Sequence, residues 1–220
     1  KAPGDKFKYW FVAYYAHWLV RNYLHPALEN LSTAYVITGD ARYAHKCALL
    51  LWQLAVYYPD YQYEKQSSYG KEVDSSYKGR LLYHTWETWT VEKAALAYDA
   101  IFPSLAQDEG LQKLAGLDAV GLQRHIEDRL LRVMADDIIS GSHIIQGNWG
   151  MHQKAALLVA LALDTETGSP NSPQIVDWVL QNHVPSATYT DTSFGDMLVN
   201  LLHRDGIAFA MLILVLIVRP

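Results

Sequence analysis

A polar, glycine-rich stretch at residues 146–153 places an amide, an indole and an imidazole directly before an apolar helix sequence. Asn148 suits the cap of that helix, because its side-chain oxygen can accept a hydrogen bond from a first-turn amide. If Trp149 opens the helix, Asn148 and His152 lie on roughly one face near the positive end of the helix dipole. Such a group suits a sugar that carries a carboxylate. The alternative is a capped, buried helix in which Trp149 and His152 only pack.

A second group of candidates surrounds the start of another predicted helix. Tyr83, Trp86, Glu87 and Trp89 follow a polar loop, residues 61–80, and loops of this length in a compact domain often have a function. The chain has fifteen Tyr and seven Trp against five Phe, so most aromatic rings carry a polar edge. Such rings are favoured between a dry core and water or a ligand. We interpret these four residues, with Trp149, as substrate-binding candidates. The alternative is a packed tryptophan pair beside an exposed glutamate.

Helices must position both groups, because apolar residues recur at helical spacing and almost no strand pattern is present. Capping residues and helix breakers set the ends. Between the second and third helices, Gly39 suits a helix C-terminus and Asp40 the next N-cap, which predicts an antiparallel hairpin. The predicted helices are Phe7–Leu24, Pro26–Thr38, Ala41–Tyr58, Thr85–Phe102, Leu117–Ile139, Trp149–Leu163, one that begins near Pro173, and Phe194–His203.

Helices joined mostly as hairpins predict an all-α fold, an incomplete (α/α) toroid of antiparallel helix hairpins. No fixed-period repeat of the tetratricopeptide or ankyrin kind is visible. Because a complete toroid needs more hairpins, we expect residues 1–209 to form a partial toroid within a longer protein. Residues 210–220 form an apolar tail. The apolar run Ile207–Val218 would be about 18 Å long as a helix, against about 30 Å for a bilayer, so no transmembrane span is predicted.

Composition and missing motifs exclude several functions. Hydrophobic residues make up 50% of the chain, and its net charge of −5 comes without a basic stripe, which argues against nucleic-acid binding. Cys47 is the single cysteine, so neither a disulfide nor a cysteine-based metal site is expected. The chain has no H-E-x-x-H, G-x-S-x-G or phosphate-loop motif, and we predict neither a metal nor a cofactor. Asp136 and Asp137 are interpreted as part of a solvated helix face.

Several segments, in this order, resemble the helical domain of the heparinase II/III-like polysaccharide lyases. The resemblance extends from about Tyr9 to Phe209, and the ordered set is more specific than any one motif. The segments are Thr38–Ala44, the Trp86-Glu87 segment that leads to Ala97-Tyr98-Asp99, Gly147–Gln153, and Arg204–Phe209, which is similar to the stretch before the family's catalytic tyrosine.

The resemblance implies an incomplete α/α toroid followed by an antiparallel β-sandwich, and β-elimination on uronic-acid polysaccharides in a secreted or periplasmic enzyme. This reaction needs a group that neutralises the sugar carboxylate, a base for the C5 proton and an acid for the leaving oxygen. Asn148 matches the position that family members use near the carboxylate. His152 is an alternative base, since imidazole titrates near neutrality.

The chain departs from the family just after Phe209, where the catalytic tyrosine is expected and residues 210–215 read AMLILV. The sandwich, which contributes a further histidine in relatives, is also absent. We therefore expect a lyase-type domain that is incomplete as this chain. One alternative is a non-catalytic glycan-binding or structural α/α scaffold. Another is an α/α-toroid glycoside hydrolase, which needs two carboxyl groups across a cleft, and Glu87 with Glu92 or Asp99 are the nominees.

Overall fold

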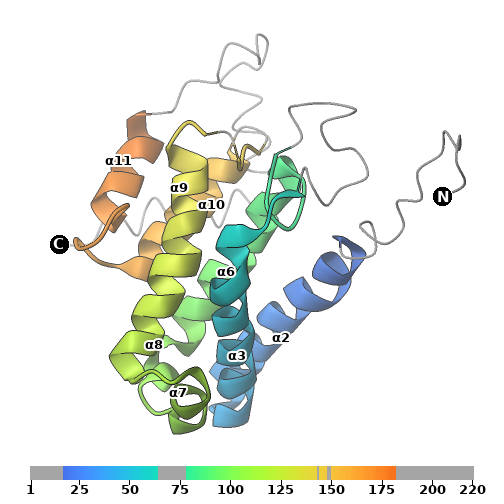
Figure 1. Cartoon of the computed structure of the whole chain (residues 1–220), viewed down its shortest axis with the longest axis vertical. Coiled ribbons are helices and arrows are strands. Elements are labelled where there is room, and N and C mark those ends of the chain that lie inside the picture. Colours follow the sequence, from blue (N-terminus) through green and yellow to red (C-terminus); the bar gives the residue numbers. More distant parts are fainter. Residues whose placement is uncertain (1–16, 64–77, 143, 148–149, 182–220) are drawn as a thin grey trace, which may run out of the picture.

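The computed structural model describes residues 17–63, 78–142, 144–147 and 150–181, and every regular element in these ranges is a helix (Figure 1). The all-α prediction is therefore confirmed for this part of the chain. Several predicted features lie outside the described residues: Asn148, Trp149, the helix Phe194–His203, the apolar tail 210–220 and most of the polar loop before Arg80.

The helices follow the predicted order with small changes at their ends. Leu117–Ile139 is divided by a π-helical turn, and a short helix, α7, was not predicted. In chain order the elements are η1 (Val20–Leu24, π-helix), α2 (His25–Thr38), α3 (Ala41–Tyr57), η2 (Tyr58–Asp60, 3₁₀), α6 (His84–Leu105), α7 (Glu109–Ala115), α8 (Ala119–Ile126), η3 (Glu127–Leu131, π-helix), α9 (Arg132–Ile139), α10 (Met151–Leu163) and α11 (Ser172–Gln181).

The turn between α2 and α3 has the predicted capping residues. Gly39 adopts a left-handed φ of 67°, and the Asp40 side chain accepts a hydrogen bond from the Arg42 amide at 2.9 Å. The next boundary differs from the prediction, because α6 continues past Phe102 to Leu105 with Pro103 inside its last turn. Proline is tolerated here at the cost of one backbone hydrogen bond.

The predicted cap of α10 is wrong. This helix begins at Met151, and its N-cap is Gly150, whose φ of 88° strongly favours glycine. Gln153 accepts a hydrogen bond from the Gly150 amide at 2.8 Å, so a side chain inside the helix closes its first turn. Asn148 precedes this cap by two residues in the sequence and lies outside the described residues.

Three helices, α2, α6 and α10, run parallel in one layer with α6 in the middle. Between α2 and α6, His25 Nε2 lies 3.0 Å from Thr90 Oγ1, and the Lys93 ammonium lies 2.8 Å from Glu29. The contacts between α6 and the α10 region follow the same direction along both segments. His84 contacts Gln146 at 2.8 Å, and Glu92, further along α6, contacts Lys154 at 3.0 Å. The N-terminal ends of all three helices therefore lie at one end of the layer.

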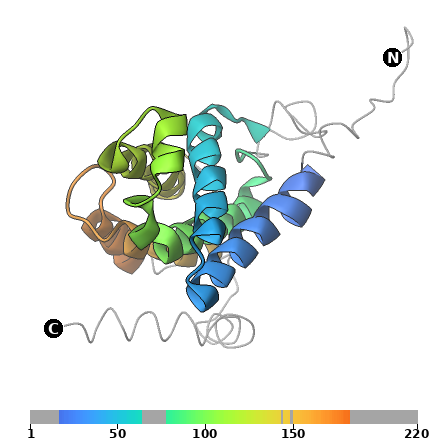
Figure 2. The ribbon, with the colours of Figure 1, turned by 90° about the horizontal axis from the view of Figure 1, so that it is seen from below.

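The helices α3, α8, η3 and α9 pack against one side of this parallel layer. Arg129, in η3, donates to the Ala55 carbonyl of α3 at 3.2 Å, and the Tyr98 hydroxyl of α6 lies 2.6 Å from Glu127. Figures 1 and 2 show α2 and α11 at opposite edges of the helical body, with the remaining helices between them. The core lies between the layers, where α6 contributes a fully buried stripe that includes Val91, Ala94 and Tyr98. Small alanines on this stripe let the neighbouring helices approach closely.

Candidate functional site

The start of α6 lies against the segment that precedes α10. His84 donates its Nδ1 hydrogen to the Gln146 carbonyl at 2.8 Å, and the Thr85 hydroxyl donates to the same oxygen at 3.4 Å. Gly147 packs so tightly that a Cβ there would lie 3.0 Å from Thr88 Cγ2. The Tyr83–Trp89 segment and the described part of the 146–153 stretch are thus neighbours, although they are about sixty residues apart in sequence.

His152 lies in the first turn of α10 and is partly buried. Its ring lies 6.0 Å from the Trp178 ring, centroid to centroid, at an interplanar angle of 60°. Trp178 belongs to α11 and was not predicted as a site residue. In the sequence it stands next to Val179, which is in the apolar stripe of α11, and this position gives no signal of a functional role. The pair places an imidazole beside an indole at the same end of the molecule as His84.

The predicted tryptophan pair lies on the side of α6 that faces the start of α2. The rings of Trp86 and Trp89 lie 4.6 Å apart in an edge-on arrangement, and Trp86 is 38% exposed. The Arg21 guanidinium carbon lies 5.5 Å and 5.2 Å from the two ring centroids, within cation–π range. Arg21 was missed from sequence, because nothing local links it to residues that are sixty-five positions away.

Tyr83 extends the aromatic surface away from α6. Its ring lies 4.0 Å from His84 and 6.2 Å from Tyr63, centroid to centroid. Tyr63 in turn lies 6.4 Å from the His17 ring. Four aromatic or imidazole rings from three separate segments therefore follow one another at this end of the molecule.

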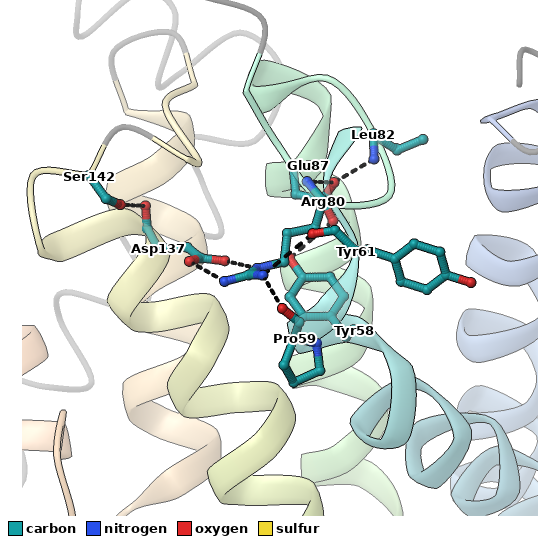
Figure 3. A network of polar contacts seen from close by, with 8 residues as sticks. All are labelled: Tyr58, Pro59, Tyr61, Arg80, Leu82, Glu87, Asp137 and Ser142. Atoms are coloured by element: carbon teal, nitrogen blue, oxygen red, sulfur yellow. Dashed lines mark hydrogen bonds and ion pairs between the residues drawn. The ribbon is translucent and has the colours of Figure 1, made fainter. Parts of the chain in front are cut away.

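Glu87, the predicted acidic substrate contact, is fully buried. Its Oε1 accepts a hydrogen bond from the Tyr58 hydroxyl at 3.1 Å, and its Oε2 accepts from the amides of Leu82 at 2.5 Å and Arg80 at 3.3 Å (Figure 3). Burial raises the pKa of Glu87 to about 7, although these hydrogen bonds oppose the increase. The carboxyl group therefore holds the chain's own segment 80–82 against α6.

Arg80 joins this carboxyl network to α9. Its guanidinium forms a bidentate pair with Asp137, with Nη2 lying 2.8 Å from Oδ1, and it donates to the Pro59 carbonyl at 2.5 Å (Figure 3). Burial raises the pKa of Asp137, while the hydrogen bond from Arg80 opposes this. Asp137 is only 2% exposed, so its interpretation as part of a solvated helix face is wrong. The network ties together η2, α9 and the start of α6, the helix that carries the tryptophan pair.

We expect Glu87→Gln to change how stability depends on pH. Between pH 4.5 and 7 the folded protein keeps a proton on Glu87 that the unfolded chain has lost, so this group's contribution to stability falls as pH rises. A glutamine resembles the protonated carboxyl and carries no such dependence. The unfolding free energy of Glu87→Gln minus that of the unmodified protein should rise by about 3 kcal/mol between pH 4.5 and 8. Urea denaturation across this range measures it, and a constant difference would contradict the assignment.

A pocket of about 670 Å³ lies at the other end of α6, where the α2–α3 turn meets the connection between α6 and α7. His45 Nδ1 lies 2.9 Å from Asp108 Oδ2 in its wall, and Asp108 also caps α7 by accepting from the Leu111 amide at 2.9 Å. The 22 residues of α6 span about 33 Å, so this pocket is separate from the surface around Trp86.

Two further features constrain function. Within the described ranges, no three His, Cys, Asp or Glu side chains are grouped as a metal ion would require. None of the helices in these same ranges is both long and apolar enough to cross a membrane.

No protein-family model, curated protein or solved structure matches this chain. The group of Trp86, Trp89, Arg21 and Tyr83 and the separate pair of His152 with Trp178 are therefore interpreted from their own chemistry.

Proposed function

We propose that the chain is the helical part of a polysaccharide lyase that cleaves uronic-acid-containing polysaccharide by β-elimination. One observation carries the proposal. The parallel layer of α2, α6 and α10 has tryptophans, a guanidinium and two histidines at one end, beside Gln146 and Gly147. Aromatic faces with polar edges suit sugar rings, and cationic and amide donors suit their carboxylates.

The helical architecture fits the proposed fold. The hairpin of α2 and α3, the pair of α6 with the α8–η3 helix, and the pair of α10 with α11 each place one helix in the parallel layer and one outside it. We propose that these pairs are successive hairpins of an incomplete (α/α) toroid. The ends of the parallel helices would then line its cleft.

The proposed reaction assigns one role to each group. A base removes the C5 proton of the uronate, the bond between C4 and the leaving oxygen breaks, and that oxygen takes up a proton while a C4–C5 double bond forms. Asn148 would donate to the carboxylate, whose negative charge grows as the C5 proton leaves. His152 is the candidate base within the chain, and Trp86, Trp89, Trp149 and Tyr83 would hold the sugar rings. Glu87 positions the start of α6 and does not contact the sugar.

A complete enzyme of this kind would also use the family's tyrosine and a C-terminal β-sandwich, and it would act outside the cytoplasm. In this proposal, the residues of the helical part bind the substrate and neutralise its carboxylate. We therefore expect this chain alone to bind acidic polysaccharide and to cleave it slowly or not at all.

Incubation with polyuronates and with neutral polysaccharides tests the proposal. Elimination leaves an unsaturated uronate that absorbs ultraviolet light, whereas hydrolysis leaves a new reducing end without this absorbance. We expect binding of the acidic polymers, and ultraviolet absorbance when the chain is extended by a segment that supplies the tyrosine and sandwich. Reducing ends without absorbance would establish a hydrolase instead.

The second candidate is a non-catalytic glycan-binding scaffold. The missing tyrosine after Phe209 favours it, and binding without elimination by any extended form would establish it. The hydrolase alternative loses one nominee, because Glu87 is fully buried and bonded to Tyr58 and Leu82.

A further inference from the structure

We infer that Arg21, Trp86 and Trp89 form a subsite for a sugar that carries an anionic substituent, a carboxylate or a sulfate. The inference rests on the proposed function and adds to it a residue, Arg21, and a charge preference. The subsite lies on the α2 side of α6, whereas His152 lies on the α10 side. It would therefore hold a sugar unit other than the one being cleaved.

The geometry leaves the guanidinium able to bind an anion. Arg21 lies over both indoles, 5.5 Å from the centroid of Trp86 and 5.2 Å from that of Trp89. The two indole planes are inclined at 61°, so the flat guanidinium can stack on at most one of them, and its in-plane N–H donors remain able to match two acceptor oxygens. An indole fixes the orientation of this fork, so less conformational entropy is lost when an anion binds.

Arg21 also differs from the neighbouring cations of the parallel layer. Lys93 is paired with Glu29 at 2.8 Å, and Lys154 is paired with Glu92 at 3.0 Å. Within the described part of the chain, Arg21 has no carboxylate partner, and its side chain is exposed. Its positive charge is thus not neutralised by these residues.

The pKa of a neighbouring histidine agrees with a positive potential here. The pKa of His25 is lowered to about 4, first by burial and then by the charges of Lys93 and Arg21. His17 shows the same direction, with burial as the main cause and Arg21 as the second. A ligand with negative charge would be attracted to this end of α2.

The backbone around Arg21 forms a rare helical turn, and exposed aromatic side chains lie at this turn. Residues 20–24 form a π-helical turn, a conformation that is rare and is often found at functional sites. Trp18 and Tyr23, five positions apart, contact edge to face with centroids 5.3 Å apart. Trp18 is 41% exposed and Tyr23 is 60% exposed, so aromatic surface continues beyond the tryptophan pair.

Binding of a defined polyuronate oligosaccharide tests the subsite. Isothermal titration compares it with its carboxyl-reduced, neutral counterpart and with a sulfated form of that neutral counterpart. Arg21→Met keeps an apolar chain over the indoles and removes the charge, and Arg21→Lys keeps a charge without the fork. Arg124→Met is the matched control, because Arg124 is an exposed arginine on α8.

We expect Arg21→Met to weaken binding of the anionic oligosaccharide about tenfold and to leave binding of the neutral one unchanged. Arg21→Lys should have an intermediate affinity for the anionic oligosaccharide. Trp86→Ala should lower the affinity for every oligosaccharide that binds, and Arg124→Met should leave all the affinities unchanged. Preference for the sulfated over the carboxylated ligand identifies sulfate as the anion that is read, and the reverse identifies carboxylate.

Two results would overturn the inference in different ways. If the unmodified protein binds acidic oligosaccharide and Arg21→Met binds it equally well, the subsite is wrong and the proposed function stands. Arg21 would then only join η1 to α6, and thermal melting of Arg21→Met would show the loss of that contact. If the unmodified protein binds no acidic oligosaccharide, the proposed function fails and the subsite fails with it.

Discussion

Arg80→Ala should lower the free energy of unfolding by about 3–5 kcal/mol, because it leaves Asp137 as an uncompensated buried charge. The side chains of this pair are 14% and 3% exposed, and the guanidinium also satisfies the Pro59 carbonyl. Urea denaturation followed by circular dichroism measures the change. A loss below about 1 kcal/mol, as for an exposed ion pair, would contradict the network described around Glu87.

Two controls separate charge burial from general damage. Arg42→Ala removes an arginine that is 86% exposed and paired with Asp40, and it should cost far less than Arg80→Ala because solvent screens this pair. The double variant Arg80→Met with Asp137→Leu replaces both charges with apolar groups, and it should recover much of the stability lost in Arg80→Ala.

Asn148→Ala should lower kcat for elimination by about 10²–10³-fold in an extended form of the protein that cleaves polyuronate. The reason is the loss of a donor to the carboxylate as its negative charge grows. Its melting temperature should stay unchanged, because Gly150 and Gln153 form the start of α10 without Asn148. Ultraviolet absorbance and thermal melting measure the two effects.

Gln153→Ala is the matched control for Asn148→Ala. It removes the side chain that accepts from the Gly150 amide, so it should lower the free energy of unfolding by about 1 kcal/mol. Its kcat should fall much less than that of Asn148→Ala. If Asn148→Ala melts earlier and keeps its kcat, Asn148 has a structural role and the scaffold alternative gains support.

The helices were predictable because their signals are local. Gly39 and Asp40 end one helix and begin the next, as expected from a glycine that favours positive φ and an aspartate that caps. The short helix α7 also had local signals, since Asp108 caps it and Gly116 ends it with a left-handed φ. At α10 the N-cap is Gly150, whose amide donates to Gln153, and not the expected Asn148.

The candidate site was predictable only in part, because its key contacts join distant residues. The burial of Glu87 had a signal, since Glu87 lies on the same helical stripe as Val91, Ala94 and Tyr98. The pairing of Arg80 with Asp137 had none, because it joins the segment before α6 to α9, which is far away in the sequence. The position of Arg21 beside the tryptophans likewise depends on how η1 and α2 pack against α6.

The most direct test of the central claim compares two polymers that differ only in charge. One is a polyuronate, and the other is the same polymer after its carboxyl groups have been reduced to hydroxymethyl groups. If the end of the layer around Trp86, Arg21 and His152 binds uronic-acid polysaccharide, the chain should bind the polyuronate at least about tenfold more tightly, and added salt should reduce the difference. Equal affinity for the two polymers, or no binding of either, would contradict the account.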